Sequence, residues 1–290
     1  MLKNFGWKTI KKYKLEIAML TPLVLYIIGL TFVPIFNTIL MSFQDPLTKE
    51  FGTLDNYKYI FGRPEFKDAF KNTLLITAIG LTLEMTFGLI IALMLMKKFR
   101  GRGLFRAVLL VPLGVPTLVS AVMLTYVFNT NGYLNELLYR LNLIQVPIDW
   151  AGGGMKTILM IVVADMWKVT PMIVLLLLAG LESISDDVYE ASAIDGASTW
   201  QTFWNVTLPL LKPSITIALI LRAIDAFRIF ELPMVLAGRS TPVLSTYAYQ
   251  EYNSYNNPYT SAAGSTILLV LILIFILGYL FIVEREKGVK

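Results

Sequence analysis

Long apolar runs separated by short polar segments dominate the pattern along the chain. A helix needs about 20 mostly apolar residues to cross a bilayer core, so each such run predicts a transmembrane helix. The third run contains Pro112, Gly114 and Pro116, which predict a kink within it. The six predicted spans are Leu15–Phe43, Phe70–Met96, Leu104–Phe128, Met155–Leu181, Ser214–Ala237 and Ser261–Val283.

Composition supports an all-α membrane protein with six transmembrane helices. Hydrophobic residues make up 56% of the 290 residues, charged residues make up 16%, and the mean hydropathy is +0.65. Soluble domains are typically about 45–50% apolar and about 25% charged. The sequence has no Cys and no His, which excludes disulfide scaffolds, Cys or His nucleophile pairs and zinc sites of the usual ligand types.

Basic residues cluster before the first span and between spans two and three. Cytoplasmic loops are enriched in Lys and Arg, so both termini are predicted to be cytoplasmic, in tails of residues 1–14 and 284–290. The segments around 131–154 and 238–260 each carry a single basic residue, Arg140 and Arg239, and are predicted to be external. The first is also predicted to contain a short amphipathic helix. A cleaved signal peptide is disfavoured because the first apolar run is too long and no small-residue cleavage site follows it. The basic residues of the two clusters are Lys3, Lys8, Lys11, Lys12, Lys14, Lys97, Lys98, Arg100, Arg102 and Arg106.

The segment between spans four and five is predicted to be cytoplasmic but is acidic, which departs from the charge trend. Ser185 can cap a helix whose first turn holds Asp186 and Asp187, both favourable at the positive end of the helix dipole. Gly196 suits the left-handed position that ends such a helix. The segment therefore predicts a helix that stops at a glycine turn.

A second helix is predicted directly after this turn. Ser198 and Gln201 have the spacing of a capping box. Pro209 and Pro213 are expected to close this helix and lead into span five. The result is a helix–turn–helix elbow, which we expect to bind a partner, because anionic cytoplasmic lipid would repel its acidic residues. Its apolar residues are Val188, Ala191, Ile194, Trp200, Phe203 and Val206.

The elbow carries a family resemblance. The stretch Glu190-Ala191-Ser192-x-x-Asp195-Gly196-Ala197, followed by Phe203 and Leu208-Pro209, closely resembles the EAA loop of ABC importer permeases. The wider pattern is similar to the carbohydrate-uptake, maltose-type branch, although Ser192 stands where that family often has Ala. Supporting stretches are Asn72-Thr73-Leu74, Leu110-Val111-Pro112, Trp167, Pro171 and Leu236-Ala237-Gly238.

The resemblance implies a domain organisation and a set of partners. A first helix and external loop (15–69) would precede a five-helix type-1 transmembrane domain (70–283) that includes the EAA loop (182–212). The implied partners are a second permease chain of different sequence, a cytoplasmic ATPase dimer, an external solute-binding protein, membrane lipid and a sugar, with no nucleic acid. The sequence contains no G-x-x-x-x-G-K-[ST], so ATP and Mg²⁺ would be used by the partner ATPase, and no cofactor or metal is expected in this chain. The residues implied to couple to the ATPase are Glu190, Ala191, Asp195, Gly196, Ala197, Phe203 and Pro209.

Charged residues inside the predicted spans need partners or water. A charge at the bilayer centre costs at least about 2.5–3.5 kcal/mol on insertion scales. Neighbouring charges in spans four and five lie three residues apart and so share helical faces, which predicts pairing within each helix. These charges are Asp165 and Lys168 in span four and Arg222, Asp225, Arg228 and Glu231 in span five, with Glu84 in span two.

Two roles for these charges remain open: a self-neutralising network that locks spans four and five together, or the polar lining of a solute path. Phe227 and Phe230 lie beside the same region and would suit the faces of a sugar. The resemblance places solute contacts at Leu113, Thr117, Asp165, Lys168, Val169, Met172 and Asp225.

Two other functions compete with an ATP-driven sugar importer. An ion-gradient-driven secondary transporter would use the intramembrane acids as proton relays, but it would have no docking role for the acidic elbow. A membrane-embedded hydrolase is disfavoured because the chain lacks a paired nucleophile motif. We therefore expect a transport subunit without an ATPase site of its own.

Overall fold

The protein is a bundle of long helices, shown by a computed structural model that describes residues 13–97 and 99–287, the last four by backbone alone. Some of the predicted cytoplasmic residues lie outside the described residues or side chains. They are Lys3, Lys8, Lys11, Lys12, Lys98 and the C-terminal tail of residues 284–290. The helical elements in chain order are α2 (Lys14–Ile27), η1 (Ile28–Phe32), α3 (Val33–Ser42), α4 (Asp55–Gly62), α5 (Pro64–Met96), α6 (Arg102–Gly114), α7 (Thr117–Phe128), α8 (Tyr133–Arg140), α9 (Met155–Glu182), α10 (Asp186–Ile194), α11 (Thr199–Thr202), η2 (Phe203–Thr207), α12 (Leu208–Phe227), α13 (Glu231–Leu236), α14 (Leu244–Asn253) and α15 (Pro258–Lys287).

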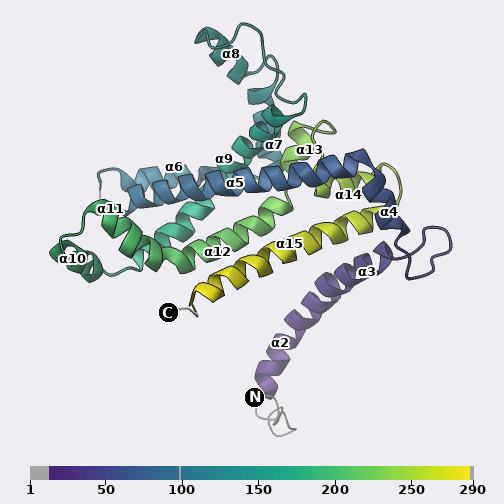
Figure 1. Ribbon diagram of the computed structural model, residues 1–290, viewed down its shortest axis with the longest axis horizontal. Helices are drawn as coiled ribbons and strands as arrows, with labels where there is room; N and C mark the ends of the chain where they lie inside the picture. The colour runs from purple at the N-terminus through teal and green to yellow at the C-terminus, as the bar shows by residue number, and fades with distance from the viewer. Residues whose placement is uncertain (1–12, 98, 288–290) are drawn as a thin grey trace.

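Helices α5, α9, α12 and α15 lie side by side and form the body of the bundle (Figure 1). One apolar cluster joins α5, α9 and α12 near the elbow, and a second joins α5, α7, α9 and α13. Close packing between α5 and α9 depends on Gly88, because a Cβ there would lie 2.6 Å from Cγ2 of Ile173. The composite first span α2–η1–α3 leaves the bundle, and none of its most apolar window is buried (Figure 1).

Four helical segments among the described residues are long and apolar enough to cross a membrane, or five if the bent pair α6–α7 counts as one span. The four segments match predicted spans one, two, four and six. Their observed ends differ from the predicted ends by at most six residues. The predicted count of six spans is not reached by this criterion, because α12 carries Lys212, Arg222 and Asp225 and does not qualify.

The third span is broken more sharply than a kink. Helix α6 ends at Gly114, α7 begins at Thr117, and the chain bends by 100° between Arg102–Gly114 and the segment Thr117–Arg140. Pro116 has no N–H for the carbonyl of Pro112, so the helical ladder stops there. Helix α7 packs against α13 and α9, and α8 beyond it projects from the bundle (Figure 1).

The fifth span is not continuous to Ala237, as the sequence predicted, but ends at Phe227. The chain resumes as the short helix α13 after non-helical torsions at Arg228 and Phe230. Pro233 cannot donate to the carbonyl of Ile229, and the Ser245 hydroxyl donates to that oxygen instead, at 2.5 Å. The break therefore follows from Pro233, whose effect on the helix is not visible in the hydropathy pattern.

Candidate functional site

The elbow has the predicted glycine turn. Gly196 has a φ of 74°, in the left-handed region, and follows α10, whose first turn holds Asp186 and Asp187. A Cβ at Gly196 would meet no atom within 4 Å, so the requirement at this position is the backbone conformation and not space. Ser185 occupies the N-cap position, but its side chain makes no capping hydrogen bond, so that prediction was wrong.

The second helix of the elbow begins as predicted and ends differently. The capping box is confirmed: the Ser198 hydroxyl accepts from the Gln201 N–H, and the Ser198 N–H donates to the Gln201 side chain. Pro209 and Pro213 do not close the helix. The π-helical turn η2 carries the chain from α11 directly into α12, with the Leu208 N–H donating to the Phe203 carbonyl. Pro209 then falls in the first turn of α12, where a missing N–H is tolerated.

Two contacts that the sequence did not indicate hold the elbow in place. The Ser192 and Thr202 hydroxyls lie 2.8 Å apart and join α10 to the start of the second helix. Glu182, at the end of α9, accepts from Arg102 at 2.8 Å and from Arg106 at 2.6 Å. Arg102 and Arg106, which were predicted only to set the orientation of the chain in the membrane, thus tie α6 to the base of the elbow.

The surface that the elbow presents is acidic and aromatic. Among the predicted coupling residues, Glu190, Ala191, Asp195, Gly196 and Pro209 are exposed, and Ala197 and Phe203 are half-buried. The rings of Trp200, Phe203 and Trp204 lie 5.2–6.2 Å apart, centroid to centroid, and Trp200 and Trp204 are both exposed. Such a surface offers both charge and large apolar area to another protein.

Inside the bundle, a cavity of about 460 Å³ gathers most of the charged residues that the sequence singled out. It contains five of the seven predicted solute contacts, while Leu113 and Met172 do not line it. The lining residues are Thr117, Asp165, Lys168, Val169, Arg222, Asp225, Arg228, Ile229, Phe230, Glu231 and Leu232.

The buried charges pair between helices and not within them, which corrects the prediction from spacing. Arg222 donates to both carboxylate oxygens of Glu84, at 2.5 Å and 3.0 Å, and also to Asp165. Glu84 is fully buried and Arg222 is 3% exposed. One guanidinium therefore joins α5, α9 and α12 through two carboxylates, a geometry that Arg is suited to because its donors form a fixed fork.

The remaining charges do not join the ion triad of Arg222, Glu84 and Asp165. Arg228 donates to Asp225 at 3.1 Å, as the spacing predicted, but both side chains are more than half exposed. Lys168 does not pair with Asp165; its ammonium donates to backbone carbonyls of the α6–α7 break. Phe230 lines the cavity, whereas Phe227 is buried against Phe275, so only one of the two phenylalanines could face a solute.

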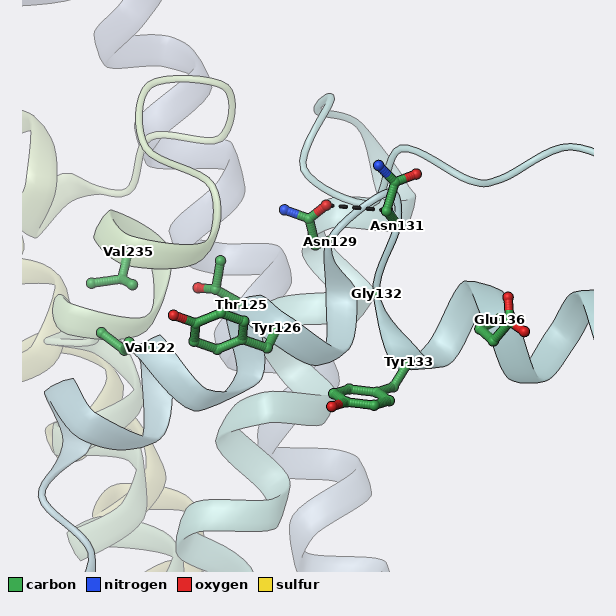
Figure 2. Close-up of a pocket in the computed structure, with 9 residues that line it drawn as sticks. All are labelled: Val122, Thr125, Tyr126, Asn129, Asn131, Gly132, Tyr133, Glu136 and Val235. Carbon is green, nitrogen blue, oxygen red and sulfur yellow. Dashed lines mark hydrogen bonds between the residues drawn. The ribbon is translucent and has the colours of Figure 1, made fainter.

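A second, larger cavity of about 790 Å³ lies where α7, α8 and α13 meet (Figure 2). Its lining includes Tyr126, Tyr133 and Glu136, which Figure 2 labels. The amide oxygen of Asn129 accepts from the Asn131 N–H at 3.1 Å and shapes the turn between α7 and α8. Sequence reasoning identified the amphipathic helix α8 but gave no signal for this cavity.

The chain resembles several transport proteins. A family profile described as "Binding-protein-dependent transport system inner membrane component" matches residues 84–286. The chain is 37% identical over 279 residues to the trehalose/maltose transport system permease protein MalF of Thermococcus litoralis, covering 93% of this chain and 94% of that one. It is 32% identical to the trehalose transport system permease protein SugA of Mycobacterium tuberculosis, over 93% and 88% of the two chains.

A solved structure has the same fold. A chain of a bacterial ABC transporter involved in the import of the acidic polysaccharide alginate superposes with a TM-score of 0.85 at 23% identity, over 96% of this chain and 98% of that one. The predicted resemblance to ABC importer permeases is thereby confirmed, and the secondary-transporter alternative is disfavoured. The chain belongs to the family of inner membrane components of binding-protein-dependent transport systems, the multi-pass permeases of ABC importers.

Proposed function

We propose that this chain is one membrane-spanning permease subunit of an ATP-driven importer of neutral saccharides. The observation that carries the proposal is the charged cavity within an otherwise apolar bundle. Three acidic and three basic residues line it, so their formal charges cancel. A neutral solute with many hydroxyl groups can use both the donors and the acceptors of such a lining, whereas an anion would meet as many like charges as opposite ones.

The permease would work with three kinds of partner. A solute-binding protein would deliver the saccharide from outside, as the family description implies, and a second permease of different sequence would complete the pathway. A cytoplasmic ATPase dimer would hydrolyse ATP with Mg²⁺, because this chain has no P-loop of its own. With α12 counted as a span, both termini and the elbow would be cytoplasmic, which agrees with the basic clusters.

The elbow would couple the ATPase to the cavity. Its acidic and aromatic surface would dock into the ATPase, and α12 runs without a break from the elbow to Arg222 and Asp225 at the cavity. Movement of the elbow would therefore be transmitted along one helix to the solute path.

Asp225→Asn tests the lining role of the cavity. The change keeps the size and the acceptor oxygen but removes the charge, and Asp225 contributes little to stability because its pair with Arg228 is exposed. We expect the assembled transporter to melt at an unchanged temperature while uptake across a panel of sugars falls or changes in selectivity. The matched control is Asp68→Asn, on the exposed face of α5. Parental uptake of every sugar by the Asp225 variant would contradict a solute contact there.

A further inference from the structure

Lys168 lies in the wall of the charged cavity, yet its ammonium donates to backbone carbonyls and not to the carboxylate of Asp165. The side chain belongs to α9 and the residue is 8% exposed. The Nζ atom donates to the carbonyl oxygens of Pro112 at 2.9 Å and Leu113 at 3.4 Å, and also to that of Val115. All three carbonyls belong to the end of α6, where the third span is broken.

These carbonyls need a donor because of the local sequence. In a continuous helix, Pro112 O would accept from the N–H of residue 116, but Pro116 has none. Within the backbone it receives only the Val115 N–H, at 3.3 Å. The carbonyl end of a helix also carries partial negative charge, which favours a cation there. An ammonium has three N–H donors, and three carbonyls use all of them.

Helix α7 starts at this break and lines both cavities. Thr117 borders the charged cavity, and Val122, Thr125 and Tyr126 border the second one. At 1.5 Å per residue, the two sets lie roughly 8–14 Å apart along the helix, about one and a half to two and a half turns. The direction in which α7 leaves the break therefore shapes both cavities at once.

We propose that Lys168 is a positioning residue for transport, which holds the α6–α7 break and so fixes α7, and that its ammonium does not bind the solute. This inference rests on the proposed transport function and revises the expectation that Lys168 is a solute contact. A residue acting through α7 affects the transport of every solute equally, whereas a ligand of the solute sets which sugar is preferred.

Uptake kinetics of the assembled transporter separate these two roles. We expect Lys168→Met, which keeps the length without donors, to lower the maximal uptake rate by about tenfold or more for every sugar, because charged hydrogen bonds are lost. The apparent KM and the ranking of sugars stay the same. Lys168→Arg, which restores donors to the carbonyls, recovers most of the rate, and Lys168→Gln falls between. Lys156→Met, on the exposed start of α9, is the matched control. A changed ranking of sugars, or a raised KM at unchanged maximal rate, would overturn the proposal.

A distance measurement tests the same claim without relying on transport. The sequence has no Cys, so Met123→Cys on α7 and Leu159→Cys on α9, both exposed, provide a clean pair for spin labels. In the assembled transporter, Lys168→Met should broaden or shift the distance distribution and Lys168→Arg should restore it. An unchanged distribution in Lys168→Met overturns the positioning role. A shifted distribution without uptake of any sugar by the parent contradicts the proposed function and supports the positioning role.

Discussion

At the scale of single residues, Arg222 is a buried cation held by two buried carboxylates. Its guanidinium donates hydrogen bonds to Glu84 and Asp165, which come from two other helices and are 0% and 6% exposed. Removal of one partner from a buried ionic group leaves uncompensated charge, and such changes cost about 3–5 kcal/mol. The triad therefore fixes how α5, α9 and α12 pack.

Arg222→Leu should accordingly destabilise the protein strongly, because two buried carboxylates lose their only shared cation. The matched control is Arg228→Leu, which breaks an exposed pair worth about 0.2–1 kcal/mol. Melting of the two variants in the assembled transporter gives the comparison. Equal shifts in melting temperature would show that the triad does not stabilise the bundle.

The same residues show what a sequence can and cannot predict about a site. The charged positions were identifiable because ionisable residues in apolar spans are costly and stand out. Their partners were not, because spacing tests only pairs within one helix, and Glu84 and Asp165 lie 138 and 57 residues from Arg222. The role of Lys168 was also hidden, since its acceptors are backbone carbonyls created by the break near Pro116.

At the scale of elements, the elbow depends on one backbone conformation. Gly196→Val should uncouple ATP hydrolysis from uptake, because a β-branched residue resists a φ of 74°. Gly196→Asn is the control, since Asn tolerates the left-handed region. We expect the Val variant to insert normally and to lose uptake, while the Asn variant keeps most of it. Parental uptake by Gly196→Val would contradict a coupling role for this turn.

The contact between α5 and α9 gives a second test at this scale. Gly88→Ala should lower the melting temperature, because the added Cβ would lie 2.6 Å from Ile173 in a buried interface. Gly278→Ala adds the same methyl group to α15 where no atom lies within 4 Å. We expect no loss of stability there, and equal melting of the two variants would argue against close α5–α9 packing.

The boundaries of the elements were predictable where hydropathy alone determines them. The predictions were wrong where prolines determine the boundary. Spans four and six follow directly from the apolar pattern. The end of α12 and the course of the chain through η2 depend on which carbonyls find another donor, such as the Ser245 hydroxyl at Ile229. Such compensation comes from residues far along the chain and cannot be read from a local pattern.

At the scale of the whole molecule, the elbow, the continuous helix α12 and the charged cavity form one connected path. Residues of α9, α12 and α13 line the cavity together with Thr117 at the start of α7, and Arg222 ties α12 to Glu84 of α5 and Asp165 of α9. This arrangement suits a subunit that receives mechanical work at the elbow and changes access at the cavity. An ion-gradient-driven carrier would need the intramembrane acids themselves to drive the cycle.

The most direct measurement is saccharide uptake into proteoliposomes that contain the permease assembled with the second permease and the ATPase that the proposed function requires. The binding protein is supplied outside, ATP and Mg²⁺ are supplied inside, and ionophores remove all ion gradients. We predict that uptake requires both ATP and the binding protein and is unaffected by the ionophores. Uptake that persists without ATP and stops when the ion gradients are removed would contradict an ATP-driven importer.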